Sequence, residues 1–304
     1  MERWVFRPRV LVDVRHRDLS TTFLGHRLSL PVMLAPIGSI EFFHSEGALA
    51  PARVAGRKGT ISFVSTMATP SLEAVAGAAQ GPLIFQLYVR RDHDWVAGIV
   101  RRVEEAGYIA LCVTVDSAVY GRRERDLHHR FGPRERLDRP NLGAAAMTDD
   151  YQSGWTWEDL AWLRDTTRLP IILKGVLTPE DAVRAVESGV EVVYVSNHGG
   201  RQLDHAPATI DLLPEIARVV AGRAELLVDS GFVRGTDVIK GVALGARAVL
   251  IGKLQTWALA AEGEAGLARA LDLLEEEIST TLALVGVPQV SALGPEAVSP
   301  AAPI

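Results

Sequence analysis

The sequence has almost no cysteine. Of its 304 residues only Cys112 is a cysteine, so no disulfide can form within the chain. Chains without disulfides are typical of reducing compartments, and we expect a cytoplasmic protein. Cys112 lies inside the apolar run Ile109–Val115, where packing in the core is its expected role.

Long hydrophobic runs and basic blocks are missing as well, although 48% of the residues are hydrophobic. No apolar stretch approaches the roughly 18 residues of a membrane-spanning helix, and no apolar signal stretch follows Met1–Trp4. The net charge of −5 and the lack of basic runs argue against nucleic acid as a partner. The chain is long enough to bury a large core, as one big domain or two ordinary ones.

What the sequence does contain is a regular series of apolar runs of strand length, after a charged and irregular N-terminal segment, residues 1–30. Most of these runs are almost continuously apolar, as strands buried on both faces are. The eight runs are Pro31–Pro36, Thr60–Ser65, Leu83–Tyr88, Ile109–Val115, Pro170–Gly175, Val192–Asn197, Glu225–Gly231 and Ala248–Lys253.

Helix signals separate the runs. Residues 94–106 place apolar side chains at helical spacing. Thr178 can cap a helix that has Pro179 at its first position. Thr236–Leu244 ends at a glycine, as helices often do. Eight strand–helix units over about 250 residues predict an α/β fold, a (β/α)8 TIM barrel, as a single domain over residues 31–287. A doubly wound open sheet is the alternative, but no Gly-x-Gly-x-x-Gly follows the first strand.

Three segments fall outside the regular pattern. The long loop after strand 4, with Ser117–Gly154 irregular and charged, is expected to act as a lid or to be solvated. It contains His128 and His129, which lack a further ligand at suitable spacing, so no metal site is predicted. An amphipathic helix is expected over about Gly263–Leu284, and the proline-containing tail, residues 288–304, is expected to be disordered.

Polar residues stand at one strand end after another, and active sites of such barrels lie at the carboxyl ends of the strands. His198 can take a proton near neutral pH, and Arg201 can hold a carboxylate with two parallel hydrogen bonds. Gly199 and Gly200 let a flat ligand approach the backbone. The glycine-containing ends of strands 7 and 8, with Lys253, stand where barrels often bind phosphate. The predicted ring of strand ends comprises Ala35–Gly38, Ser65–Thr66, Gln86, Tyr88, Thr114, Asp116, Lys174, Ser196–Arg201, Asp229–Gly231 and Gly252–Lys253.

These residues carry a resemblance to a known family. The chain resembles the FMN-dependent α-hydroxy acid oxidases and dehydrogenases, which include glycolate-, lactate- and mandelate-oxidising enzymes. The most specific segment is Ser196-Asn197-His198-Gly199-Gly200-Arg201-Gln202. The other matching motifs, in the family's order, are Phe6-Arg7-Pro8-Arg9, Leu34-Ala35-Pro36, Phe85-Gln86-Leu87-Tyr88, Thr114-Val115-Asp116, Gly121-Arg122-Arg123, Leu173-Lys174-Gly175 and Asp229-Ser230-Gly231.

The resemblance implies an FMN-dependent oxidation of a small (S)-2-hydroxy acid to the 2-oxo acid, with oxygen, a quinone or another acceptor reoxidising the flavin. It also implies a homo-oligomer, with a tetramer as the expected state. His198 would be the catalytic base and Asp116 its carboxylate partner. Tyr88 would hydrogen-bond the reacting oxygen, and Arg123 and Arg201 would bind the substrate carboxylate. The residues implied to bind the cofactor are Pro36, Ile37, Gly38, Ser65, Gln86, Thr114, Lys174, Ser196, Asp229, Ser230, Gly231, Gly252 and Lys253.

Lys174 has a particular implied role, because it would lie beside flavin N1 and stabilise the negative charge of the reduced ring. The sequence departs from the family pattern at several positions. Val233 and Lys253 stand where the family usually has arginines near the phosphate, and Met67 takes a pocket position that is often aromatic. Gly38 stands near flavin N5, where some members have alanine. A further N-terminal segment found in members has no counterpart before Phe6.

Three other interpretations remain open. A Schiff-base aldolase-type lyase would use Lys174 as its nucleophile. A flavin barrel of the isopentenyl isomerase type would not need Arg201 beside His198. A minimal flavin-binding barrel would fold and bind the cofactor with little turnover.

Overall fold

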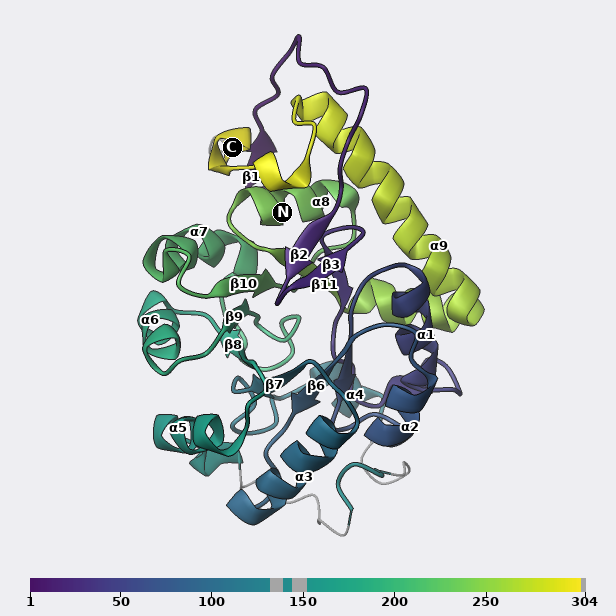
Figure 1. The fold of residues 1–304 in the computed structure, drawn as a ribbon, viewed down its shortest axis with the longest axis vertical. Helices are drawn as coiled ribbons and strands as arrows, with labels where there is room; N and C mark the ends of the chain where they lie inside the picture. Colours follow the sequence, from purple (N-terminus) through teal and green to yellow (C-terminus); the bar gives the residue numbers. More distant parts are fainter. Residues whose placement is uncertain (132–138, 144–151, 302–304) are drawn as a thin grey trace.

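Eight parallel strands close into a barrel in a computed structural model, which describes residues 1–131, 139–143 and 152–301 (Figure 1). Around the barrel the strand order is β10-β11-β4-β5-β6-β7-β8-β9, so neighbours in the chain are also neighbours in space. Each strand lies within one of the predicted apolar runs or extends one residue beyond it, and the (β/α)8 prediction is confirmed. The strands are β4 Val32–Leu34, β5 Ser62–Ser65, β6 Leu83–Leu87, β7 Ala110–Thr114, β8 Ile171–Val176, β9 Val192–Val195, β10 Glu225–Val228 and β11 Ala248–Ile251.

The helices lie around the outside of the barrel (Figure 1). The predicted N-terminal cap of α6 is confirmed, because the Thr178 hydroxyl accepts a hydrogen bond from Asp181 N at 3.2 Å and Pro179 opens the helix. The described helices are α1 Leu49–Arg57, α2 Leu72–Ala78, α3 His93–Glu105, α4 Glu124–His128, α5 Trp157–Thr166, α6 Pro179–Glu187, α7 Thr209–Val220, α8 Gly235–Ala243 and α9 Lys253–Val285. None of these helices is long and apolar enough to cross a membrane.

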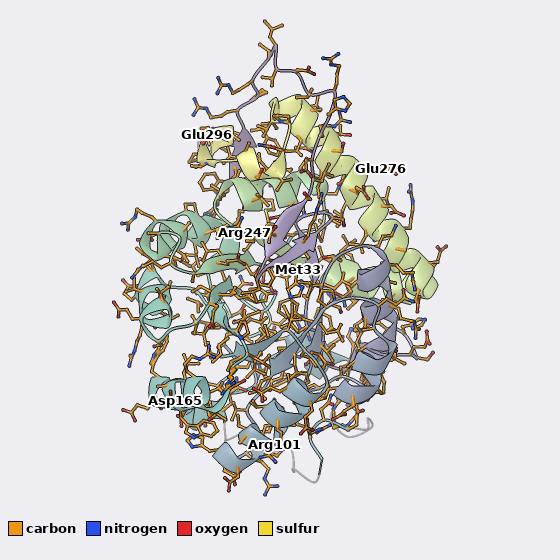
Figure 2. All side chains as sticks on the ribbon, viewed as in Figure 1. Met33, Arg101, Asp165, Arg247, Glu276 and Glu296 are labelled. Atoms are coloured by element: carbon orange, nitrogen blue, oxygen red, sulfur yellow. The ribbon has the colours of Figure 1, made fainter. Side chains whose placement is uncertain are left out.

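The core has two layers. One fills the interior of the barrel and includes Met33, Cys112 and Tyr194, all fully buried, which confirms the packing position of the cysteine. The other lies between the strands and the surrounding helices. Because each strand contributes side chains to both layers, its sequence is apolar at nearly every position. Figure 2 shows Met33 in the barrel region, whereas charged residues such as Arg101 and Glu276 lie at the periphery.

A short hairpin, β2 Thr21–Phe23 with β3 His26–Leu28, contributes fully buried side chains to the interior layer. These are Phe23 and Leu28, which pack against residues of the barrel strands. The N-terminal segment expected to be irregular therefore contains short strands, and the carboxyl ends of the barrel strands hold the cavity described below.

The prediction of a disordered tail is wrong for residues 288–301. There β12 Val298–Pro300 pairs antiparallel with β1 Trp4–Phe6, and two 3-10 turns, Val290–Ala292 and Pro295–Ala297, precede it. The tail is ordered because it supplies a pairing partner to the other end of the chain and buries Val290 against the outer core. Residues 302–304 lie outside the described part.

Two further predictions differ from the structure. Helix α9 begins at Lys253, ten residues before the predicted start, and Glu262 and Gly263 have non-helical angles at a kink there. The long loop was predicted to be irregular, but its described part contains helix α4 and a 3-10 turn, Gln152–Gly154. The rest of that loop, residues 132–138 and 144–151, lies outside the described residues.

Candidate active site

The predicted base and its carboxylate are in contact. The chain leaves β9 at Val195 and turns so that His198 adopts a left-handed backbone angle, φ 59°. Its Nδ1 lies 3.0 Å from Asp116 Oδ1 and 3.2 Å from Oδ2. A carboxylate can only accept, so Nδ1 carries the proton and donates to it. Nε2 then presents its lone pair, 3.1 Å from the Tyr88 hydroxyl, which donates to it.

Burial and nearby charges set the protonation states of these groups. Burial alone would raise the pKa of the Asp116 carboxyl, but the Lys174 ammonium and the hydrogen bond from His198 hold that pKa below its usual range. Burial lowers the pKa of the His198 imidazole and Lys174 lowers it further, which together outweigh the opposing effect of Asp116. Burial raises the pKa of the Tyr88 hydroxyl to about 12. At neutral pH, His198 is therefore a neutral base beside an ionised carboxylate and a protonated phenol.

Lys174 is the buried cation of the site. Its Nζ lies 3.9 Å from Asp116 Oδ2 and 5.5 Å from the centre of the Tyr194 ring. Burial acts to lower the pKa of the Lys174 ammonium, yet the carboxylates of Asp116 and Asp229 raise it well above its usual range. The Nζ atom makes no hydrogen bond with the described residues. A charged, buried donor without an acceptor is suited to a ligand that carries negative charge or an acceptor atom.

The approach of Asp116 to Lys174 depends on a glycine. The pairing register of β8 shifts between Lys174 and Val176, and the intervening Gly175 has φ +111°. A Cβ atom at Gly175 would lie 2.6 Å from the Cβ of Asp116. No larger residue fits at that distance, so the bulge and its glycine bring the carboxylate that follows β7 beside the lysine of β8.

A cavity of about 370 Å³ opens over these groups at the carboxyl ends of the strands. It brings together most of the predicted site residues. Those that line it are Pro36, Ile37, Gly38, Tyr88, Arg123, Lys174, His198, Arg201, Asp229, Ser230, Gly231, Gly252 and Lys253.

The other predicted cofactor residues lie behind the cavity wall, where they are fully or almost fully buried. Ser65 donates to Gln86 Oε1 at 2.7 Å, and Gln86 Nε2 donates to Thr114 at 2.8 Å, which forms one chain of hydrogen bonds across β5, β6 and β7. Ser196 accepts from the backbone N–H of His198 at 3.2 Å and holds the turn. The structure thus places these side chains beneath the site and bonded to one another or to the backbone.

The two predicted carboxylate-binding arginines reach the cavity from facing loops. Arg201 Nη2 lies 3.5 Å from Asp126 of α4. Arg123 stacks on Tyr120 with its guanidinium carbon 4.2 Å from the ring centre, and its buried Nε makes no hydrogen bond with the described residues. The described part of the long loop therefore contributes directly to the cavity. The neighbouring Arg122 has a largely exposed side chain.

The glycine-containing ends of β10 and β11 fit a phosphate with less positive charge than an arginine pair would give. Ser230 Oγ accepts from Gly199 N at 3.0 Å, and Lys253 Nζ donates to Gly199 O at 3.4 Å. Val233 lines the cavity, whereas the neighbouring Arg234 points away and pairs with Glu277 at 2.7 Å. Among the described lining residues contributed by these two strand ends, Lys253 is the only cation. The residues present fit a phosphate-bearing flavin: Lys253 would hold the phosphate, and Lys174, whose Nζ has no hydrogen-bond partner among the described residues, would supply positive charge to the ring.

Several residues of the site were not predicted from the sequence. Arg139 and Glu41 form a buried ion pair at the cavity wall, and Phe42 and Phe131 line the mouth. Arg139 and Phe131 belong to the long loop, and Glu41 and Phe42 follow β4. No local motif marks contacts between such distant segments, so the only available signal was their place after strand ends.

A parallel barrel that gathers a base–carboxylate pair, a buried lysine and open glycine turns at one end is a TIM-barrel enzyme built for an anionic cofactor and a proton transfer. The family model described as FMN-dependent dehydrogenase matches residues 1–300. The chain belongs to this family: it is an oxidoreductase, and its cofactor is FMN.

Individual relatives agree with the family. A peroxisomal (S)-2-hydroxyacid oxidase of Arabidopsis thaliana is 44% identical over 300 residues, which cover 95% of this chain and 83% of that protein. An L-lactate oxidase of Nostoc sp. is 43% identical over 309 residues, covering 95% and 85%. The crystal structure of a soluble mutant of the membrane-associated (S)-mandelate dehydrogenase from Pseudomonas putida matches with a TM-score of 0.94 at 38% identity, over 99% of this chain and 88% of that one.

The charge-poor phosphate end leads to a prediction about cofactor affinity. Val233→Arg should tighten FMN by about tenfold or more, because one charge-assisted hydrogen bond contributes roughly 1.5–3 kcal/mol and each 1.4 kcal/mol is tenfold. Lys253→Arg should act in the same direction, since a guanidinium offers a rigid pair of donors. Titration with quenching of flavin fluorescence measures both. Riboflavin, which lacks the phosphate, is the control ligand and should gain little; equal affinity of the parent protein for riboflavin and FMN would mean that no phosphate site operates here.

Proposed function

We propose that the protein oxidises an (S)-2-hydroxy acid to the corresponding 2-oxo acid, with His198 as the base. One observation carries the proposal: the Nε2 atom of a neutral His198, held by Asp116 and beside the Tyr88 hydroxyl, faces the same cavity as Arg123 and Arg201. A base and two carboxylate-binding cations within one cavity match a substrate that carries a hydroxyl and a carboxylate on neighbouring carbons. The named relatives support this substrate class.

The roles of the chain's own groups follow from their geometry. The alcohol loses two electrons and two protons, and His198 Nε2 takes one of these protons, from either the α-carbon or the hydroxyl. Asp116 then stabilises the imidazolium through Nδ1. The Tyr88 hydroxyl, protonated at neutral pH, hydrogen-bonds the reacting oxygen. Bound FMN supplies the two-electron acceptor, and Lys174 provides fixed positive charge for it.

The protonation state of Lys174 speaks against the lyase interpretation. A Schiff-base lysine must lose its proton to attack a carbonyl, and barrel enzymes lower its pKa for that purpose. Here Asp116 and Asp229 raise the pKa of Lys174, which keeps it charged. The isomerase-type interpretation leaves Arg201 unexplained, although this arginine lines the same cavity as His198.

The test of the function is anaerobic mixing of the FMN-loaded protein with glycolate, lactate, mandelate and longer 2-hydroxy acids. Loss of the flavin absorbance with at least one acid is expected, and its absence with all of them would leave only a flavin-binding barrel with little turnover. Oxygen and soluble quinones, offered to the reduced protein, distinguish an oxidase from a dehydrogenase. A homotetramer and a reducing, cytoplasmic location remain part of the proposal, to be checked by light scattering and by cell fractionation.

Arg201→Lys should weaken the reaction with hydroxy acids by about tenfold or more even though the charge is kept, because a lysine cannot form the two parallel hydrogen bonds of a guanidinium. The measurement is kcat/KM for a hydroxy acid beside that for an uncharged 2-hydroxy amide, which lacks the carboxylate. The amide should lose much less. Equal losses for both substrates would show that Arg201 supports the loop through Asp126 and does not bind the carboxylate.

A further inference from the structure

One side of the cavity is an apolar wall. Phe42, at the end of the 3-10 turn Ile40–Phe42, lies on it together with Met67 after β5 and Phe131 of the long loop. The rings of Phe42 and Phe131 pack edge to face with centroids 5.1 Å apart. They nevertheless remain 42% and 48% exposed. Two large rings that line a cavity and keep this much surface uncovered provide apolar contact area for a ligand.

The strand order places this wall across the barrel from Lys174 and His198. In the closed barrel β4 stands across from β8, and β5 stands across from β9. Phe42 and Met67 follow β4 and β5, while Lys174 lies in β8 and His198 lies in the turn after β9. A hydroxy acid whose carboxylate reaches Arg201 and whose α-carbon lies at His198 directs its remaining substituent away from β9. The apolar wall is what that substituent meets.

A buried ion pair holds the wall in place. Arg139 Nη1 lies 2.9 Å from Glu41 Oε1 and donates to Met67 O at 2.9 Å, while Nη2 donates to Ser39 Oγ at 2.8 Å. The side chains of Arg139 and Glu41 are only 9% and 10% exposed. Buried pairs of this kind add little net stability, and their best-attested use is to fix a specific arrangement. Here the pair ties the loops after β4 and β5, which carry Phe42 and Met67, to the long loop.

We propose that Phe42, Met67 and Phe131, positioned by the Arg139–Glu41 pair, form a subsite for an apolar substituent on C2 of the substrate. The preferred substrate is then a 2-hydroxy acid with an aromatic or long aliphatic side chain, and glycolate and lactate are poor substrates. This inference rests on the proposed function, because it assumes that a 2-hydroxy acid occupies the cavity.

The first test compares kcat/KM for glycolate, lactate, 2-hydroxyhexanoate and 3-phenyllactate. The two longer acids should exceed lactate by at least about tenfold, since each methylene buried in an apolar site contributes roughly fourfold. Equal or higher values for glycolate or lactate would overturn the subsite while leaving the proposed function intact. Failure of every acid to react would instead overturn the proposed function.

The second test measures binding without turnover. Phenylacetate and acetate, which lack the hydroxyl, are titrated into the FMN-loaded protein by calorimetry. Phe42→Ala and Phe131→Ala should each weaken phenylacetate by about tenfold and leave acetate unchanged, because only the larger ligand reaches the wall. Trp257→Ala is the matched control, since this aromatic side chain is also exposed but does not line the cavity. Equal losses for both ligands would mean that the rings serve packing alone.

The third test addresses Arg139 and Glu41 as positioning residues. The double variant Arg139→Gln with Glu41→Gln removes both charges and so leaves neither one buried alone. The preference for phenylacetate over acetate should fall by about tenfold, while the dissociation constant of FMN stays unchanged. Ser39→Ala, which removes one hydrogen bond to Arg139, should reduce the same preference by a smaller factor and is available if the double variant does not fold. An unchanged preference in a folded variant would overturn the positioning role.

Discussion

His198→Ala should lower the rate of flavin reduction by a 2-hydroxy acid by about 10²–10⁴-fold, the range that a general acid–base group typically contributes. The fold and the bound FMN should be retained, because the imidazole contacts Asp116 and Tyr88 at the cavity and is not one of the side chains that fill the barrel interior. Anaerobic stopped-flow measurement of flavin bleaching gives the rate, and the absorption spectrum of the purified variant reports the retained cofactor.

The matched control is His205→Ala. His205 belongs to the same loop after β9, also has a left-handed backbone angle, and is exposed. Its removal should leave the bleaching rate close to that of the parent protein. A His198→Ala variant that bleaches nearly as fast as the parent, with the same substrate, would remove His198 from the mechanism and leave the cavity without an identified base.

Asp116→Asn should be nearly as damaging, with a loss of about 10²-fold or more. The amide still accepts the hydrogen bond from Nδ1 but no longer stabilises the imidazolium that forms as His198 takes a proton. Removing the carboxylate also leaves Lys174 without its nearest charged partner, 3.9 Å away. Both changes make His198 a weaker base. The pre-steady-state reduction rate measures the loss.

The same variant has a distinctive pH dependence. In the parent protein the pKa of His198 is below its usual value, because burial and Lys174 outweigh Asp116. Only the neutral imidazole is a base, so kcat/KM is sustained at neutral pH and falls as the pH drops through that lowered pKa. Asp116 acts to raise this pKa, so in Asp116→Asn the fall should move to still lower pH. Asp204→Asn, an exposed carboxylate in the His198 loop, should leave the profile unchanged. An unchanged profile in Asp116→Asn would show that the Asp116 carboxylate does not set the pKa of His198.

The barrel strands could be predicted because their signal is local. Each strand buries both faces, so a run such as Ala110–Thr114 is apolar at nearly every position and needs no knowledge of its neighbours. The N-terminal cap of α6 is equally local, since Thr178, Pro179 and the acidic residues after them lie within one helical turn. The base and its partner were predictable by motif, although 82 residues separate His198 from Asp116.

What could not be predicted depends on pairing between distant segments. The tail resembled a disordered segment in composition, but Val298 pairs with Phe6. No local sequence pattern predicts this pairing. The start of α9 was missed because the last strand and the helix adjoin at Gly252–Lys253, and the kink at Gly263 looked like a beginning. The Arg139–Glu41 pair joins residues 98 positions apart through two loops. The pair and the apolar wall that it positions form only when the closed barrel brings these loops together.

The bulge at Gly175 limits how this chemistry could be moved or redesigned. Catalytic groups are side chains, yet Gly175, the position that lets Asp116 approach Lys174, has no side chain at all. Transplanting the carboxylate, lysine and histidine onto another set of neighbouring strands would fail unless the receiving strand had a bulge with a left-handed glycine at the same offset. Backbone shape therefore determines where around the barrel the acid–base centre can lie, because the catalytic side chains can meet only at a bulge of this kind.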